Sequence, residues 1–291
     1  MTGHIRMRFA RRIATTAAVV SASISATAGL AIAGTGSTAG TAVTSRYVAL
    51  GDSYASGSGL SGQQDSQCAR SNRSYPALLA LVYKSSFKNA TCTGATTRSI
   101  WNHQGSKPPQ ANSLSADTTL VTLTIGGNDI GFSEIIATCI SGATNNRNGN
   151  PCEKYYGDQL RQRIEKLSPR IGAVLQDIKR RSPRARVLLV GYPSLLPANG
   201  ADCKWESVPF AKGDIPYLDR TVFQLNEMLR QQAAWNSTTY VDLYTATKGA
   251  DMCQPANKRF IEPVMPLGAK SAHPNLTGHV MMTAFIKRTI G

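Results

Sequence analysis

The chain has 291 residues, 42% of them hydrophobic, which is the size and composition of one soluble domain with a full hydrophobic core. Its formal net charge is +15, but the basic residues lie along polar helix faces without interleaved aromatic residues, which argues against nucleic-acid binding. We interpret the charge as a contribution to solubility and to attraction by anionic surfaces, including anionic lipid.

Residues 1–42 are predicted to form a secretory signal that precedes a single domain at residues 43–291. Several arginines come before an apolar, alanine-rich stretch at residues 13–34, and small residues suited to cleavage follow it. A membrane anchor is the alternative, but the stretch holds many hydroxyl groups and few large aliphatic side chains. The chain is therefore expected to be secreted.

The first predicted strand of the domain, residues 47–50, ends at Gly51 in a polar turn that contains Ser53. Ligands of parallel α/β sheets bind outside the carboxyl ends of the strands, where N–H groups of the next helix receive negative charge. Ser53 is therefore a candidate nucleophile. The alternative is that it only caps a helix.

No cofactor and no metal ion are predicted. Residues 57–62 fit the pattern G-x-G-x-x-G, but the first glycine does not directly follow the strand, and no acidic residue ends a second strand about twenty positions later. The sequence holds no C-x-x-C pair, and its four histidines are scattered, which disfavours zinc.

Six cysteines follow the signal segment, and an even number in an exported protein predicts three disulfides. We favour bonds between neighbours in sequence, because each then closes one loop between core elements and stabilises the fold by about 2 to 4 kcal/mol. The pairs are Cys68 with Cys92, Cys139 with Cys152, and Cys203 with Cys253.

Strands and helices are predicted to alternate over the rest of the chain, which indicates a three-layer α/β/α sandwich with a mostly parallel sheet. A break in the long helix is expected at Ser168-Pro169, as a kink or a restart. The predicted helices are residues 74–84, 158–181, 216–235 and the last segment to about 290, and the further strands are 89–92, 119–125, 186–191 and 239–243.

Two of these strands end in residues that can contribute hydrogen-bond donors. Gly94 follows the strand at residues 89–92, and Asn128 follows the β-branched strand at residues 119–125. The glycine allows close backbone approach, and the asparagine N–H₂ can point into the same cleft as Ser53. An ordinary Asn-Asp turn is the alternative.

His273 is the candidate general base. Pro274 and Asn275 are predicted to fix a turn and cap the final helix, which leaves His273 on the loop before it. An unperturbed imidazole titrates near neutral pH and can therefore take a proton from a serine. His279 lies within the predicted helix and is expected to be structural.

Taken in order, the motifs Gly51-Asp-Ser-Tyr54, Gly94, Gly126-Gly-Asn-Asp129 and His273-Pro-Asn275 resemble those of the SGNH hydrolases, also called GDSL esterases and lipases. The chain most resembles their secreted bacterial lipase and phospholipase branch. This resemblance implies a five-stranded flavodoxin-like fold.

The resemblance also implies a Ser-His acyl-enzyme mechanism in which Ser53 is the nucleophile and His273 the base. The oxyanion hole then consists of the Ser53 and Gly94 N–H groups and the Asn128 side chain. The expected substrate is a lipid or another acyl ester, with transient lipid-surface contact, and a monomer is expected.

Two residues depart from the usual family pattern. Tyr54 replaces a leucine, which is a common variant, and Lys270 occupies the position where an aspartate often orients the histidine. We therefore expect the backbone carbonyl of Ser271 to orient His273. Glu262 and Asp251 are the fallback carboxylates.

Two apolar, proline-containing stretches, residues 192–197 and 261–267, are candidates for the walls of an acyl groove, with ordinary packing as the alternative. The acyl-chain length and head group are left open. Two other functions are kept, a carbohydrate acetylesterase of the same fold and a secreted non-catalytic binding protein.

Overall fold

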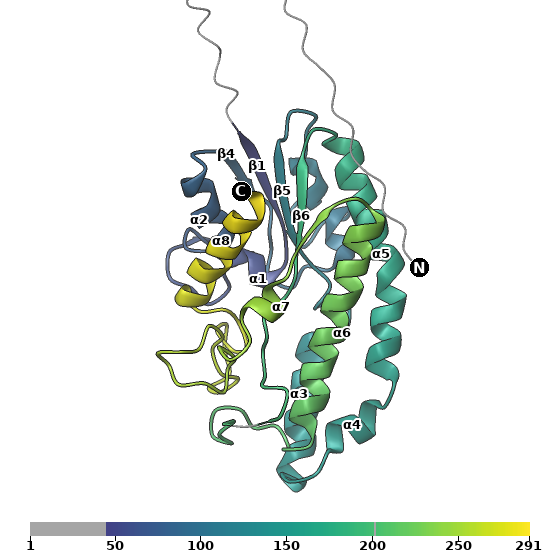
Figure 1. Ribbon diagram of the computed structural model, residues 1–291, viewed down its shortest axis with the longest axis vertical. Coiled ribbons are helices and arrows are strands. Elements are labelled where there is room, and N and C mark those ends of the chain that lie inside the picture. Colours follow the sequence, from purple (N-terminus) through teal and green to yellow (C-terminus); the bar gives the residue numbers. More distant parts are fainter. Residues whose placement is uncertain (1–44, 201) are drawn as a thin grey trace, which may run out of the picture. The chain divides into compact units, whose positions relative to one another are not determined.

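The computed structural model describes residues 45–200 and 202–291, so the predicted signal segment at residues 1–42 lies outside the described residues. Figure 1 shows a central sheet with helices on both of its faces. This three-layer arrangement confirms the predicted fold class. Within the described residues, no helix is long and apolar enough to span a lipid bilayer.

Five parallel strands form the sheet in the order β4-β1-β5-β6-β7. Strand β1 (Arg46–Gly51) pairs with β4 (Ser86–Asn89) on one side and with β5 (Leu120–Thr124) on the other, and β6 (Arg186–Val190) and β7 (Thr239–Val241) extend the sheet beyond β5. After β1 the chain forms β4 at one edge of the sheet, and it then crosses back to form β5 on the other side of β1. The direction of winding therefore changes between β1 and β5, where open α/β sheets bind their ligands.

Helices α2 (Tyr75–Val82) and α8 (Leu276–Ile290) pack on one face of the sheet, and α5 (Gln159–Arg181) and α6 (Asp214–Trp235) on the other (Figure 1). Successive residues of a strand point to opposite faces, so β1, β5, β6 and β7 each contribute to both apolar layers, whereas β4 contributes only Phe87, on the side of α2 and α8. The shorter elements are α1 (Ser53–Ser56), β2 (Gln63–Asp65), β3 (Arg70–Ser71), the 3₁₀ helices η1 (Thr97–Ile100) and η2 (Gln110–Ser113), α3 (Phe132–Asn145), α4 (Pro151–Tyr156) and α7 (Leu243–Ala246).

The predicted bounds of one strand were wrong, and so was the restart that was one of two alternatives for the long helix. The strand expected at residues 89–92 is β4, which ends at Asn89, because pairing with β1 begins at the polar residue Ser86. Helix α5 runs without interruption through Pro169, so no new helix starts there. The proline leaves the carbonyl of Glu165 without its helical partner, and Glu165 is exposed to water that can replace it.

Gly51 allows β1 to turn sharply against β5. Its φ is +140°, and a Cβ atom added to it would lie 2.4 Å from the carbonyl oxygen of Thr124. The Gln110 side chain hydrogen-bonds to both the N–H and the C=O of Gly51, at 2.7 and 2.9 Å. Asp52 N–H then donates to the Thr124 carbonyl at 2.9 Å. These contacts fix the backbone that leads into Ser53.

Three disulfides join Cys68 to Cys92, Cys139 to Cys152, and Cys203 to Cys253, which is the pairing of neighbours favoured from the sequence. The first of them lies beside Gly94, because Thr93 N–H also donates to the Cys68 carbonyl at 2.9 Å. It therefore joins the segment that carries β2 and β3 to the start of the Gly94 turn.

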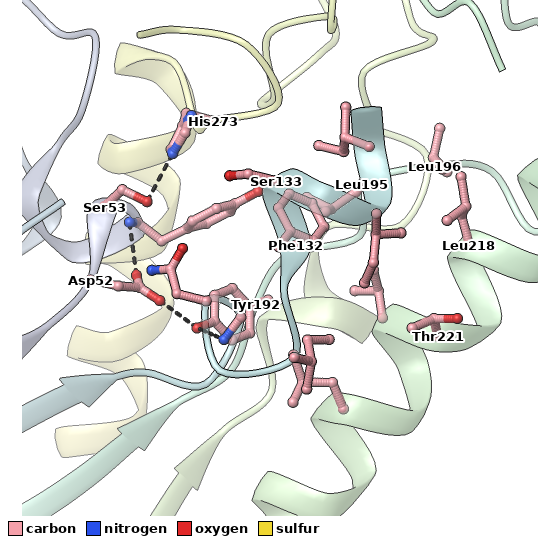
Figure 2. A pocket seen from close by; sticks show the side chains of 18 of the residues that line it. Asp52, Ser53, Phe132, Ser133, Tyr192, Leu195, Leu196, Leu218, Thr221 and His273 are labelled. Carbon is pink, nitrogen blue, oxygen red and sulfur yellow. Dashed lines mark hydrogen bonds between the residues drawn. The ribbon is translucent and has the colours of Figure 1, made fainter. Parts of the chain in front are cut away.

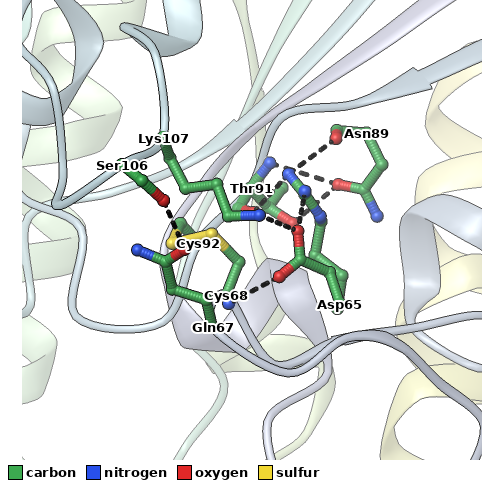
Figure 3. A network of polar contacts seen from close by, with 9 residues as sticks. Asp65, Gln67, Cys68, Asn89, Thr91, Cys92, Ser106 and Lys107 are labelled. Atoms are coloured by element: carbon green, nitrogen blue, oxygen red, sulfur yellow. Dashed lines mark hydrogen bonds and ion pairs between the residues drawn. A yellow bond between two sulfur atoms is a disulfide. The ribbon is translucent and has the colours of Figure 1, made fainter.

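Asp65 is the centre of a polar network beside this disulfide (Figure 3). Its carboxylate accepts hydrogen bonds from Arg70, from Lys107 at 2.6 Å and from the backbone N–H of Cys68 at 3.1 Å. Burial opposes ionisation of Asp65, but the bond from Lys107 and the other partners lower its pKa to about 2. The network thus favours the charged carboxylate in the folded state.

We predict that Asp65→Asn lowers the free energy of unfolding by about 2 kcal/mol at pH 7, because two cations lose their charged partner. The contribution is complete above the unfolded aspartate pKa of about 4 and is lost as the pH falls through about 2. Urea unfolding at pH 7 and at pH 2 measures both effects. Asp117→Asn is the control, since its ion pair with Arg46 is half exposed and is expected to contribute much less to stability. Equal losses in the two variants would contradict the prediction.

Candidate active site

Ser53 begins α1 directly beyond the carboxyl end of β1. Asp52 is the N-cap residue, and its carboxylate accepts a hydrogen bond of 2.9 Å from Tyr54 N–H. Ser53 is only 7% exposed, and it lines a pocket at this edge of the sheet. Its hydroxyl therefore faces a cavity from a backbone that is fixed on both sides.

The structure brings His273 and Ser53 together across 220 residues of sequence. His273 Nε2 lies 2.8 Å from Ser53 Oγ (Figure 2), and His273 Nδ1 lies 2.8 Å from the carbonyl oxygen of Ser271. A carbonyl can only accept, so Nδ1 carries the hydrogen and Nε2 is free to accept the serine proton. Burial lowers the pKa of His273 below its usual value, although the Ser271 carbonyl acts in the opposite direction.

Among the described residues, no carboxylate is hydrogen-bonded to His273. The Glu262 carboxylate pairs with Arg259 at 2.8 Å, and Asp251 accepts from the backbone N–H of Cys253 at 2.9 Å. Lys270, in the position of the usual aspartate, is exposed. The contacts of His273 are thus those of a Ser-His dyad oriented by a main-chain carbonyl.

The proposed oxyanion donors, Ser53, Gly94 and Asn128, all line the same pocket. Gly94 has a φ of +74°, which glycine adopts at little cost. One N–H of the Asn128 amide donates to the Ala95 carbonyl at 2.9 Å, which fixes the amide and leaves its second N–H for a ligand. Within residues 45–200 and 202–291, the backbone N–H groups of Ser53 and Gly94 make no hydrogen bond.

Tyr192, which follows β6, ties the nucleophile turn to the turn after β5. Its hydroxyl donates to the Asp52 carboxylate at 2.5 Å and accepts from Gly127 N–H at 2.8 Å. Burial raises the pKa of Asp52 to about 7, with the hydrogen bond from Tyr192 acting against that rise. Sequence analysis assigned Tyr192 only to an apolar loop, because nothing local indicates that its hydroxyl reaches a residue 140 positions away.

The pocket lies between α3 and α6, with Ser53 and His273 at one end and Leu218 and Thr221 of α6 at the other (Figure 2). Its walls are mainly aliphatic and aromatic. The apolar lining residues are Ile130, Phe132, Ile135, Ile136, Leu195, Leu196, Phe210, Leu218, Val222, Leu225 and Met252.

Of the two stretches predicted to line an acyl groove, only residues 192–197 contribute to this pocket. Residues 261–267 do not line it, because Ile261 and Val264 are fully buried in the core while Met265 and Leu267 are exposed. The walls from α3 were missed, since no helix was predicted there. Its apolar residues recur every three or four positions, and this periodicity is the signal that indicates the helix.

The chain is similar to known enzymes over most of its length. The GDSL-like Lipase/Acylhydrolase family matches the chain over residues 49–281. Lipase 2 of Streptomyces coelicolor is 34% identical over 255 residues, which cover 85% of this chain and 86% of that protein.

Two solved structures resemble the chain closely. The extracellular lipase of Streptomyces rimosus superposes with a TM-score of 0.73 at 27% identity, covering 84% of this chain and all of that one. Phospholipase A1 of Streptomyces albidoflavus superposes with a TM-score of 0.72 at 28% identity, covering 84% and 99%.

We predict that the acid limb of kcat/KM on a soluble ester has its midpoint below about pH 6.5, because the pKa of His273 is lowered and only the neutral imidazole accepts a proton. Activity is then retained at mildly acidic pH and lost as the pH falls through the histidine pKa. A pH–rate profile measures the midpoint. Asp52→Asn keeps an oxygen that accepts from Tyr54 N–H but replaces the one that accepts from Tyr192 by an N–H₂ group, and its acid limb is expected at the same pH. If the acid limb of the pH–rate profile disappears in this variant, the titrating group is Asp52 and not His273.

Proposed function

The chain belongs to the GDSL-like lipase/acylhydrolase family and is an acyl ester hydrolase, and on that premise we propose that Ser53 is its nucleophile and His273 its general base. The observation that carries the proposal is the 2.8 Å contact between Ser53 Oγ and His273 Nε2 at one end of an apolar pocket. The histidine has its hydrogen on the opposite nitrogen, as a base requires.

In the acylation step, His273 Nε2 takes the Ser53 proton while Ser53 Oγ attacks the carbonyl carbon of the ester. The oxyanion receives hydrogen bonds from the Ser53 and Gly94 N–H groups and from the Asn128 amide. The C–O bond then breaks, and the alcohol leaves with the proton held by His273.

In the deacylation step, His273 takes a proton from water, and the resulting hydroxide attacks the acyl-enzyme carbonyl. The same three donors stabilise the second oxyanion. The Ser53 ester bond breaks, Ser53 regains its proton from His273, and the free acid is released.

We propose that the substrates are long-chain acyl esters of lipids. The aliphatic and aromatic walls between α3 and α6 can bury an acyl chain, and each buried methylene contributes about 0.8 kcal/mol. An acetyl group would leave most of these walls without a partner. Relatives named as lipases and a phospholipase A1 agree with this substrate class.

Secretion is part of the same proposal. The three disulfides are consistent with an oxidising environment, and the similar lipase of Streptomyces rimosus is described as extracellular. The monomer and the absence of a nucleic-acid partner, expected from the sequence, remain part of the proposal as well.

The reaction is tested with a fluorophosphonate probe and p-nitrophenyl esters from acetate to palmitate. We expect labelling and turnover in the wild type, a loss of roughly a thousandfold or more in Ser53→Ala, and the highest kcat/KM with a long chain. A maximum at acetate would favour the carbohydrate acetylesterase. If the wild type is neither labelled by the probe nor hydrolyses any of the esters, a non-catalytic binding function is better supported.

We further propose that residues 265–270 contact the lipid surface. This segment is exposed, carries Met265 and Leu267 as apolar groups and Lys270 as a cation, and directly precedes the segment that presents His273. Apolar insertion and attraction to anionic head groups act together at such a surface.

The surface contact is tested with a variant that combines Met265→Ser and Leu267→Ser. It is expected to sediment less with vesicles that contain phosphatidylglycerol and to lose activity on emulsified long-chain esters, while hydrolysis of a soluble short ester is unchanged. Leu81→Ser on α2 is the control, because Leu81 is 72% exposed but lies on another element. Equal vesicle binding by all three proteins would refute the contact.

A further inference from the structure

The orientation of the general base depends on a short backbone segment, residues 269–272, rather than on a carboxylate. Nδ1 of His273 contacts only the carbonyl of Ser271, at 2.8 Å, among the described residues. A backbone carbonyl can hold an imidazole ring in one orientation only if the backbone that carries it is itself fixed. The contacts of this segment therefore decide how His273 is placed.

Two backbone bonds hold the segment on one side. Ala272 N–H donates to the Glu262 carbonyl at 3.2 Å, and Glu262 N–H donates to the His273 carbonyl at 2.9 Å. Ala272 nevertheless has a φ of +56°, in the left-handed region that alanine rarely adopts. Such a conformation persists only where the surroundings enforce it.

The other side of the segment rests on the chain that carries the nucleophile. The Tyr54 hydroxyl donates to the Ala272 carbonyl, and Ser58 Oγ donates to the Ala269 carbonyl at 3.2 Å. A Cβ atom added at Gly59 would lie 2.8 Å from Cα of Lys270, so the two backbones are in close contact. Residues 54–59 thus form a support for the segment before His273.

We propose that Tyr54 is a positioning residue for the general base and that it fulfils, through Ala272, the orienting task of the missing carboxylate. Tyr54 follows Ser53 in the sequence, so one rigid turn positions both the nucleophile and the carbonyl that orients His273. The Tyr54 ring also lies against the His273 ring, with centroids 5.2 Å apart. This inference rests on the proposed roles of Ser53 and His273.

The environment of Tyr54 fits a donor that stays protonated. Its side chain is buried, and burial together with the nearby Asp52 raises the pKa of the phenol well above its usual value. The edge of its ring also packs on Tyr192, with centroids 5.1 Å apart. Packing alone would be preserved by phenylalanine, so the hydroxyl can be tested separately from the ring.

The test is Tyr54→Phe, measured on a soluble short ester and with the fluorophosphonate probe. We expect kcat and the labelling rate to fall by roughly tenfold to a hundredfold with KM almost unchanged, because the base moves while substrate contacts remain. The downfield proton resonance of His273 Nδ1–H is expected to broaden or disappear, which a packing role would not produce.

Tyr47→Phe is the matched control. It also removes a buried tyrosine hydroxyl, which bonds to the Thr122 side chain at 2.7 Å on the opposite face of the sheet. We expect it to lower thermal stability and leave kcat and the His273 resonance unchanged. If both variants lose kcat to the same extent, the effect is a general loss of stability and the inference is wrong.

Ser58→Ala provides a second measurement, should Tyr54→Phe not fold. It removes the weaker support of the same segment and is expected to lower kcat a fewfold without a change in KM. If Tyr54→Phe folds and keeps the wild-type kcat, the inference is wrong. If Tyr54→Phe does not fold, a wild-type kcat in Ser58→Ala has the same meaning. In both cases Ser53→Ala is expected to be inactive. Loss of labelling in the wild type would instead refute the proposed function itself.

Discussion

The hydrogen bond from Asp52 N–H to the Thr124 carbonyl continues the parallel ladder of β1 and β5 beyond the last paired residue of β1. The turn that carries Ser53 and the turn that carries Asn128 therefore leave the sheet at the same level. Gly51 permits this because no side chain separates it from Thr124. Tyr192 then connects the two turns from the next strand, so the candidate site depends on the register of three neighbouring strands.

Much of this arrangement could be predicted from the sequence, since the central strands are continuous apolar segments and the polar motifs follow their ends. Ser53, Asn128 and His273 were chosen as candidates in this way, and the structure places all three at one pocket. The orienting carbonyl of Ser271 was also expected, because Lys270 ruled out the usual carboxylate. Contacts that depend on side-chain reach were not predictable. Gln110 bonds to Gly51 across 59 residues, and no local pattern indicates that pairing.

The pocket shows where sequence reasoning failed and why. Apolar, proline-containing stretches on both sides of the sheet edge had the same appearance in sequence, yet only residues 192–197 reach the cavity. Residues 261–267 use Ile261 and Val264 for the core instead. Helices α3 and α6 provide most of the remaining wall. The proposed acyl-binding surface is thus built largely from elements outside the strand ends that carry the candidate catalytic groups.

Several of the polar groups at the site belong to the main chain, namely the N–H groups of Ser53 and Gly94 and the carbonyl of Ser271. A substitution other than proline cannot delete such a group; it can only displace it. Mutational tolerance at these positions should therefore follow how well the backbone is held, and the Ser271 hydroxyl helps to hold it by accepting from Gly268 N–H at 2.8 Å and donating to the Pro266 carbonyl at 3.1 Å. The walls from α3 and α6 consist of side chains, so substitutions there would reshape the proposed acyl pocket and leave these main-chain groups in place.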